Sequence, residues 1–195
     1  MGFLKSLKGM LTPKADDETR TAPKASAEEK AIQEVERLPV FSGHRATSSW
    51  VQYKINVTPK NAWIAIGRAN TATEWLNTTT SPMDYREHWE EAIYYMSSLA
   101  RIEGKMRFKG EHPSAILRRM KLEYNQCLFE FLERYAKNHQ ENRIAPLKTK
   151  KGKLNRAKEF LPGLDEMWSN MTKDGRARAE ELAALEVAMI EGGEI

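Results

Sequence analysis

Large apolar residues recur every three or four positions along much of this chain, and this spacing limits its fold more than any other feature. It is clearest after Pro113, in the series Ile116, Met120, Tyr124, Cys127, Phe131 and Tyr135. Side chains three and four residues apart share one face of an α-helix. The same spacing runs through 82–104, 154–171 and 173–191. The sequence therefore predicts a mostly α fold of five to seven helices around an aromatic-rich core, with a mobile N-terminal amphipathic tail.

The aromatic residues of this pattern are predicted to lie in the core rather than to form stacking platforms, because periodic placement is what a packed helix requires. They are Trp63, Tyr85, Trp89, Tyr124 and Tyr135. In the predicted helix 59–77, Trp63 shares a face with Ala62, Ile66, Thr73 and Leu76. The core face predicted for the last helix consists of Ala179, Leu182, Leu185 and Met189.

Several residues mark where helices begin and end. Ser26 and Glu29 have the spacing of a capping box. Thr58-Pro59 and Ser81-Pro82 each combine an N-cap residue with a proline at the first helical position. Pro162-Gly163 is expected to divide the last apolar seam into two helices or one broken helix. Gly192 is expected to end the final helix.

Residues 51–57 show the one clear period-two pattern in the chain. Val51, Tyr53, Ile55 and Val57 alternate with polar residues, as in a strand that is buried on one side. No second segment offers a strand to pair with it. The alternative is that this segment is extended and packs across the helices.

The chain opens with an amphipathic segment, "MGFLKSLKGMLTPK". On a helix, its large apolar residues share an arc of about 120°. They are Phe3, Leu4, Leu7, Met10 and Leu11. Residues 1–11 are predicted to be a docking helix, 12–27 a flexible linker and 28–195 the helical domain. A helix this short needs a surface to fold on, which is a membrane interface, a protein partner or the domain itself. The other interpretation is an unstructured terminus.

The composition excludes some classes of protein. No apolar run approaches the 18 residues that a membrane-spanning helix needs. The single cysteine, Cys127, rules out an intrachain disulfide, fits a reducing compartment and is predicted to be a core residue. The four histidines are far apart, so no metal site is predicted. No catalytic or cofactor-binding motif is present. The chain is therefore predicted not to be an enzyme and to need no cofactor.

The strongest charge feature is the stretch "RIAPLKTKKGKLNRAK", residues 143–158, which contains no acid. Its cations are Arg143, Lys148, Lys150, Lys151, Lys153, Arg156 and Lys158. Such a run fits nucleic-acid phosphates. It also fits an ordinary solvated helix whose lysine stems flank an apolar stripe. Both interpretations remain open from the sequence.

The stretch "LKTKKGKLNRAKEF", which follows "FLERYAKNHQ", resembles a pattern in uncharacterised proteins of phages and mobile elements from Gram-positive bacteria. The resemblance extends back through "HPSAILRRMKLEYNQCLFEFLERY" and covers the second half of the chain. It implies a bacterial cytoplasm and a gene carried by a phage or a transferable element, but no activity. The first hypothesis is thus a non-catalytic accessory protein that docks through residues 1–11 on a protein partner or on the inner face of the membrane. The alternative is a nucleic-acid-binding protein that uses residues 143–158.

Overall fold

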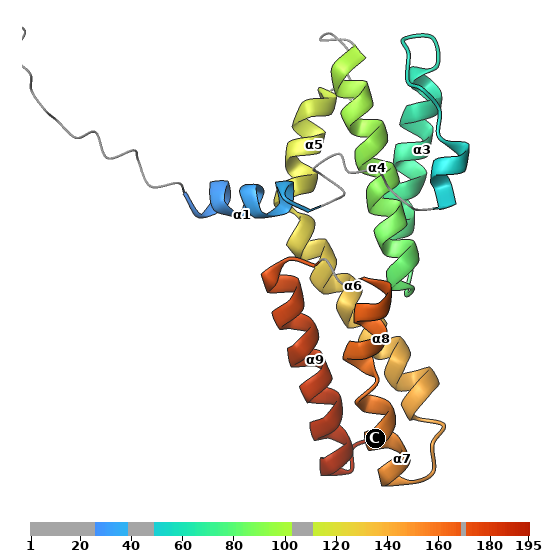
Figure 1. The fold of residues 1–195 in the computed structure, drawn as a ribbon, viewed down its shortest axis with the longest axis vertical. Helices are drawn as coiled ribbons and strands as arrows, with labels where there is room; N and C mark the ends of the chain where they lie inside the picture. The colour runs from blue at the N-terminus through green and yellow to red at the C-terminus, as the bar shows by residue number, and fades with distance from the viewer. Residues whose placement is uncertain (1–25, 39–48, 103–110, 169–170) are drawn as a thin grey trace, which may run out of the picture.

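The computed structural model describes residues 26–38, 49–102, 111–168 and 171–195 (Figure 1). All regular structure within these ranges is helical, which confirms the mostly α fold class. In chain order the elements are α1 (Ala27–Glu36), the 3₁₀-helix η1 (Ser49–Tyr53), α3 (Ala62–Leu76), α4 (Pro82–Ile102), α5 (Pro113–Leu122), α6 (Tyr124–His139), the π-helical turn η2 (Gln140–Ile144), α7 (Lys150–Ala157), α8 (Phe160–Met167) and α9 (Lys173–Gly192).

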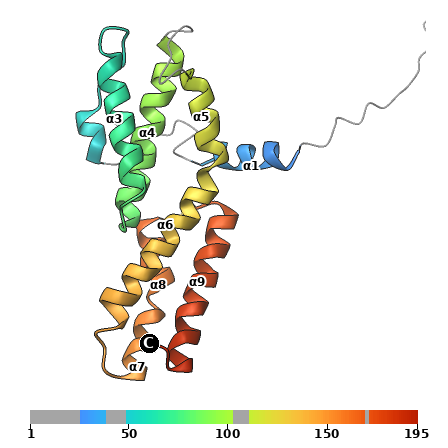
Figure 2. The ribbon, with the colours of Figure 1, turned by 180° about the vertical axis from the view of Figure 1, so that it is seen from behind.

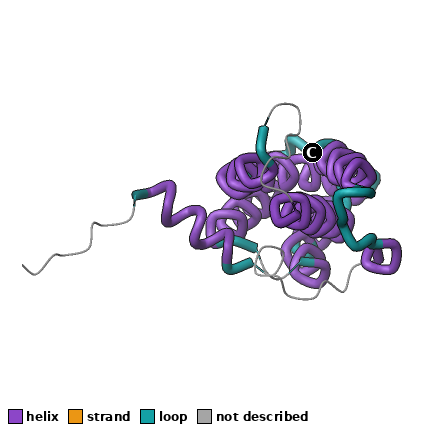
Figure 3. Tube along the Cα trace, turned by 90° about the horizontal axis from the view of Figure 1, so that it is seen from above, coloured by secondary structure: helices purple, strands orange, loops and turns teal. Residues whose placement is uncertain are grey.

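The helices form two groups stacked along the long axis (Figures 1 and 2). One group contains α3, α4 and α5, and the other contains α6 to α9. A bend at Glu123 joins α5 to α6, and the hydrogen bonding continues through it. The Glu123 N–H donates to the Arg119 carbonyl oxygen (2.9 Å), and the Cys127 N–H donates to that of Glu123 (2.9 Å). The helix predicted to start at Pro113 is therefore present with one bend, and it links the two groups. Seen from above, down the long axis, α1 projects sideways from the bundle (Figure 3).

One aromatic core runs through both groups. Tyr85 of α4 stacks on Phe131 of α6, with the ring centroids 4.2 Å apart. Trp89 approaches Tyr124 at 5.0 Å, and Trp168 approaches Tyr85 at 5.6 Å. All five side chains are buried. Because the rings come from both groups of helices, they hold the two groups together as a single domain.

Three of the predicted helix starts are confirmed. The Ser26 hydroxyl accepts from the Glu29 N–H, and the Glu29 carboxylate accepts from the Ser26 N–H, which completes the capping box of α1. The Ser81 hydroxyl accepts from the backbone of the first turn of α4, which begins at Pro82. Pro113 occupies the first position of α5. Each of these groups satisfies or replaces a backbone donor that a helix leaves unpaired at its first turn.

Two predicted helix boundaries are wrong. α3 begins at Ala62 rather than after Thr58, because residues 58–61 form a turn in which the Thr58 N–H donates to the Asn61 side chain (2.7 Å). The break in the last seam precedes Phe160, and Pro162-Gly163 lies inside α8. Pro162 is in the first turn of that helix, where its missing N–H removes no intrahelical hydrogen bond.

Residues 49–58 form no strand, and the alternative of an extended segment packed on the helices is confirmed for 54–58. Ile55 and Val57 pack against the core. The Tyr94 hydroxyl donates to the Ile55 carbonyl oxygen (3.0 Å), and the Ile55 N–H donates to the Tyr95 hydroxyl (3.4 Å). Tyrosine side chains of α4 thus satisfy backbone groups that a neighbouring strand would otherwise have to pair.

The core face of α9 matches the prediction only in part, since Met189 is half-buried. Ala179 and Leu182 are buried as expected, but Leu185 is 54% exposed. Ile190 takes part in a smaller cluster with Ile144 and Ala157, near the C-terminal end of the helix. The helix ends one residue later than predicted, since Gly193 adopts the left-handed conformation (φ 79°) that favours glycine.

Candidate interaction surface

The outward face of α3 carries two tryptophans that are open to solvent. Trp63 is 73% exposed and Trp75 is 54% exposed. The side of α3 that faces the core carries mostly small side chains instead. Its residues are Ala62, Ala65, Ala69, Ala72 and Leu76. Alanines allow α3 and α4 to pack closely and leave no space for an indole between them. The prediction that Trp63 lies in the core is therefore wrong.

A shallow groove of about 330 Å³ lies between the outward side of α3 and the edge of α4. It is lined by Trp63, Ile64, Gly67, Arg68 and Thr71 from α3 and by Glu91 from α4. We call these six residues together with Trp75 the tryptophan face. The face combines large aromatic side chains with a flat middle section at Gly67, a shape that suits an extended partner such as a helix.

The rim of the groove is held in place by contacts within the protein. Nη1 of Arg68 donates to the Tyr95 hydroxyl (2.9 Å) and to the Tyr53 carbonyl oxygen. The guanidinium carbon lies 5.8 Å from the centroid of the Tyr95 ring. Burial raises the pKa of the Glu91 carboxyl, and the positive charge of Arg68 acts in the opposite direction. The groove therefore keeps its shape without a ligand, which lowers the entropy cost of binding one.

At the other end of the face, Trp75 lies on His88 of α4. The two rings are nearly parallel (19°), with centroids 5.8 Å apart. Burial lowers the pKa of the His88 imidazole, while the Asp84 and Glu87 carboxylates act in the opposite direction. His88 and Glu91, one helical turn apart, therefore support the tryptophan face from α4.

The cations of the basic stretch 143–158 gather around α7 and the adjoining η2, and two of them bind within the protein. Nζ of Lys150 donates to the Glu191 carbonyl oxygen (2.9 Å), and Arg156 pairs with Glu159 (2.7 Å). Lys153 is half-buried. The rest of the set, Arg143, Lys148, Lys151 and Lys158, is exposed. The structure therefore leaves a smaller positive surface than the seven predicted cations imply.

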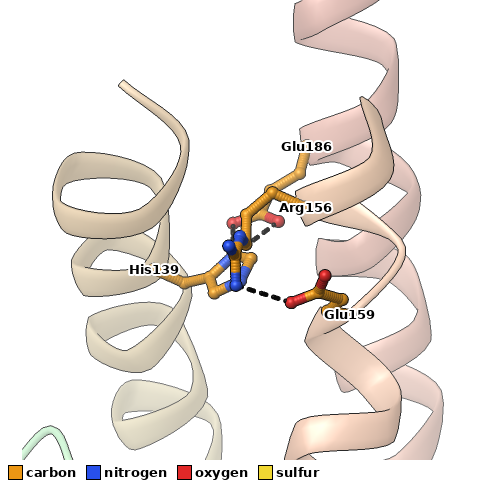
Figure 4. Close-up of polar contacts among 4 residues, drawn as sticks. All are labelled: His139, Arg156, Glu159 and Glu186. Carbon is orange, nitrogen blue, oxygen red and sulfur yellow. Dashed lines mark hydrogen bonds and ion pairs between the residues drawn. The ribbon is translucent and has the colours of Figure 1, made fainter. Parts of the chain in front are cut away.

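A buried ionisable pair, which the sequence analysis missed, joins α6 to α9. Nδ1 of His139 lies 3.1 Å from both carboxylate oxygens of Glu186, and the two residues are only 7% and 4% exposed. Figure 4 shows this pair beside the Arg156–Glu159 pair. The sequence does contain a signal for this buried carboxylate, because Glu186 lies four residues after Leu182 on the apolar stripe of its helix. The pair is closed off between helices, and its geometry fits a structural link.

The predicted docking residues Phe3, Leu4, Leu7, Met10 and Leu11 lie outside the described residues, as does the predicted linker up to residue 25. Within the described ranges, no three metal-ligating side chains gather into a group that fits a metal ion. No helix in those ranges has the length and hydropathy to cross a bilayer.

No protein-family model, curated protein or solved structure matches this chain.

Proposed function

We propose that this chain is a non-catalytic interaction protein that binds a protein partner through the tryptophan face. The exposure of Trp63 and Trp75 on one helix is the observation that carries this proposal. Each fully buried tryptophan removes roughly 150–250 Å² from water, and tryptophan is enriched among the residues that dominate binding energy. Two indoles on a preformed surface therefore offer far more binding energy than an ordinary solvated helix does.

The N-terminal segment supplies a second docking element in this proposal. Its apolar arc would bind a membrane surface or the same protein partner, with Lys5 and Lys8 facing water or lipid headgroups. The resemblance of the second half of the chain supports an accessory role for a phage or mobile element in the bacterial cytoplasm.

The test is affinity purification from the bacterium that carries the gene, with two variants beside the natural chain. Trp63→Ser with Trp75→Ser should lose the partner, because these substitutions remove both indoles and leave the alanine side of α3 intact. Leu185→Ser is the matched control, since it removes an exposed apolar side chain from α9. Equal capture by the tryptophan variant and the natural chain would refute the proposal.

The N-terminal element is tested separately with Phe3→Glu and Leu7→Glu together. We expect this variant to lose co-sedimentation with vesicles or partner at an unchanged melting temperature. A large fall in the melting temperature would show instead that residues 1–11 belong to the core, and equal sedimentation would show that they are not the docking element.

Nucleic-acid binding is the second candidate function. It is supported by the exposed cations that remain around α7, of which Lys151 and Lys158 have no role in the core. Lys151→Gln and Lys158→Gln should each flatten the slope of log K against log salt by about 0.7–0.9. Lys137→Gln, on an exposed lysine paired with Glu141, is the control. If the natural chain is not retained on DNA or RNA at low salt, this candidate is excluded.

A further inference from the structure

The outward face of α3 is close to symmetric about its middle residue, Ala69. Trp63 and Trp75 lie six residues before and after Ala69, and Gly67 and Thr71 lie two residues before and after it. At 100° per residue, Ala69 points directly away from the centre of the face formed by the other four. Ala69 is indeed fully buried. A 180° rotation that reverses the direction of the helix therefore exchanges the large residues Trp63 and Trp75, and likewise the small residues Gly67 and Thr71.

Gly67 has no reason to be glycine within one copy of the chain. A Cβ added at this position would meet no atom within 4 Å. Helix interiors disfavour glycine relative to alanine, and α3 continues for nine residues beyond Gly67. A small residue on an open helix face allows a second helix to approach closely, as small residues do at other helix–helix contacts.

We propose that the tryptophan face binds a second copy of this chain, with the two α3 helices antiparallel and a two-fold axis at Ala69. Gly67 of each copy then faces Thr71 of the other, and Trp63 of each copy faces Trp75 of the other. A two-fold interface requires such a self-complementary surface, in which residue i meets residue j and j meets i. This inference rests on the proposed function of the tryptophan face and names its partner.

The charges at the ends of α3 agree with this arrangement. Lys60 precedes the helix and Glu74 lies near its end, and both are exposed. In the antiparallel register, Lys60 of one copy faces position 78 of the second copy, one helical turn beyond Glu74, so these opposite charges lie at the same end of the contact. A parallel arrangement would instead place like charges together.

The area available indicates a weak dimer. At the exposed fractions of Trp63 and Trp75, the two indoles offer roughly 200–300 Å² per copy. For two copies this is roughly 400–600 Å², below the lower limit of about 1,200 Å² for stable interfaces. The dimer should therefore form at high concentration and dissociate on dilution. Its Kd is expected to be on the order of micromolar or weaker.

Sedimentation equilibrium of the full chain over roughly 5 to 500 µM tests the dimer, since this range brackets the weak affinity expected from the area. We expect the mass to rise from 22.4 kDa toward twice that value. Gly67→Arg should remain monomeric with an undiminished melting temperature, because its side chain enters open space in the monomer and blocks the second copy. Leu185→Ser should dimerise like the natural chain. A natural chain that stays monomeric throughout, or Gly67→Arg chains that dimerise equally well, would overturn the inference.

The register is tested by oxidation in a Cys127→Ser background. Chains carrying Gly67→Cys and chains carrying Thr71→Cys should form a disulfide when mixed, and neither should form one alone. Cross-linking of Thr71→Cys chains with one another would overturn the proposed axis.

The two proposals fail separately. If the natural chain is monomeric but loses its partner from the bacterium with Trp63→Ser and Trp75→Ser, the second copy is wrong and the interaction surface stands. If the natural chain is monomeric and captures the partner equally well with and without those substitutions, both proposals are wrong.

Discussion

Removing His139 alone from the buried pair that it forms with Glu186 between α6 and α9 should destabilise the domain far more than removing both residues. His139→Leu leaves the Glu186 carboxylate 4% exposed and without the imidazole that lies 3.1 Å from both its oxygens. Breaking a buried pair in this way costs about 3–5 kcal/mol. For a chain of 195 residues, each kcal/mol lowers the melting temperature by about 2–4 °C. We therefore expect His139→Leu to melt roughly 6–20 °C below the natural chain.

Glu186→Leu should cost about 1–3 kcal/mol, because it leaves the buried imidazole of His139 without its partner. The double variant His139→Leu with Glu186→Leu should lie within about 2 kcal/mol of the natural chain, because it leaves no unpaired polar group and adds apolar surface to the interface. The measurement is urea unfolding followed by circular dichroism at neutral pH, analysed as a double-mutant cycle. The two single losses should therefore exceed the double loss by several kcal/mol.

A control exists on the same two helices. Arg178 of α9 pairs with Glu133 of α6 at 2.7 Å, but the Glu133 side chain is 55% exposed. Glu133→Gln should cost no more than about 1 kcal/mol. If His139→Leu is as mild as this control, or if the losses in the double variant simply add, the buried pair does not link the helices as argued.

Three other perturbations have defined outcomes. Gly67→Ala should raise the free energy of unfolding by about 0.5–1 kcal/mol in monomeric conditions, whereas Gly175→Ala should lower it by about 1–3 kcal/mol because the new methyl group would overlap a buried leucine of α6. Cys127 should react slowly with thiol reagents in the native chain and rapidly in denaturant, because burial raises the pKa of its thiol. The pKa of His88 is lower in the folded state than its unfolded value of 6.5, so the unfolded chain binds more protons and stability should fall as the pH drops below 6.5. His88→Gln should remove this part of the pH dependence, and the fluorescence of Trp75 should change over the same pH range in the natural chain only.

The sequence was sufficient for the class of fold and for most of the core. Helical spacing identified Tyr85, Trp89 and Tyr124 correctly, because these large residues lie on faces that have no competing apolar side. Capping chemistry placed the starts of α1 and α4 for a local reason, since a cap satisfies the backbone of its own first turn. Contacts across the fold decided the rest. The extended path of residues 54–58 depends on the hydroxyls of Tyr94 and Tyr95 about forty positions later.

The tryptophan face could not be predicted because α3 offers two apolar sides. The wheel of residues 62–76 has an alanine stripe on one side and indoles on the other, and size alone favours burial of the indoles. The large residues Tyr85 and Trp89 of α4 lie in the same core cluster as the alanines of α3. A helix that packs beside such residues needs small side chains at the contact. Which face of α3 is buried thus depends on the side-chain volumes of both helices at their contact. The pattern of one helix alone does not contain this information.

Two departures from the usual division between apolar interior and polar surface remain, and they have different physical meanings. Glu186 is a charged residue inside the protein, but His139 compensates it within the same chain. Trp63 is a large aromatic residue on the outside, and 73% of it remains exposed in the folded chain. Sequences that break a local rule at a cost in stability usually do so for function or have a compensating contact. Because the first departure is compensated internally, it needs no partner. The second is not, and in the proposed dimer its compensation comes from a second copy of the chain, whose α3 would cover the indole.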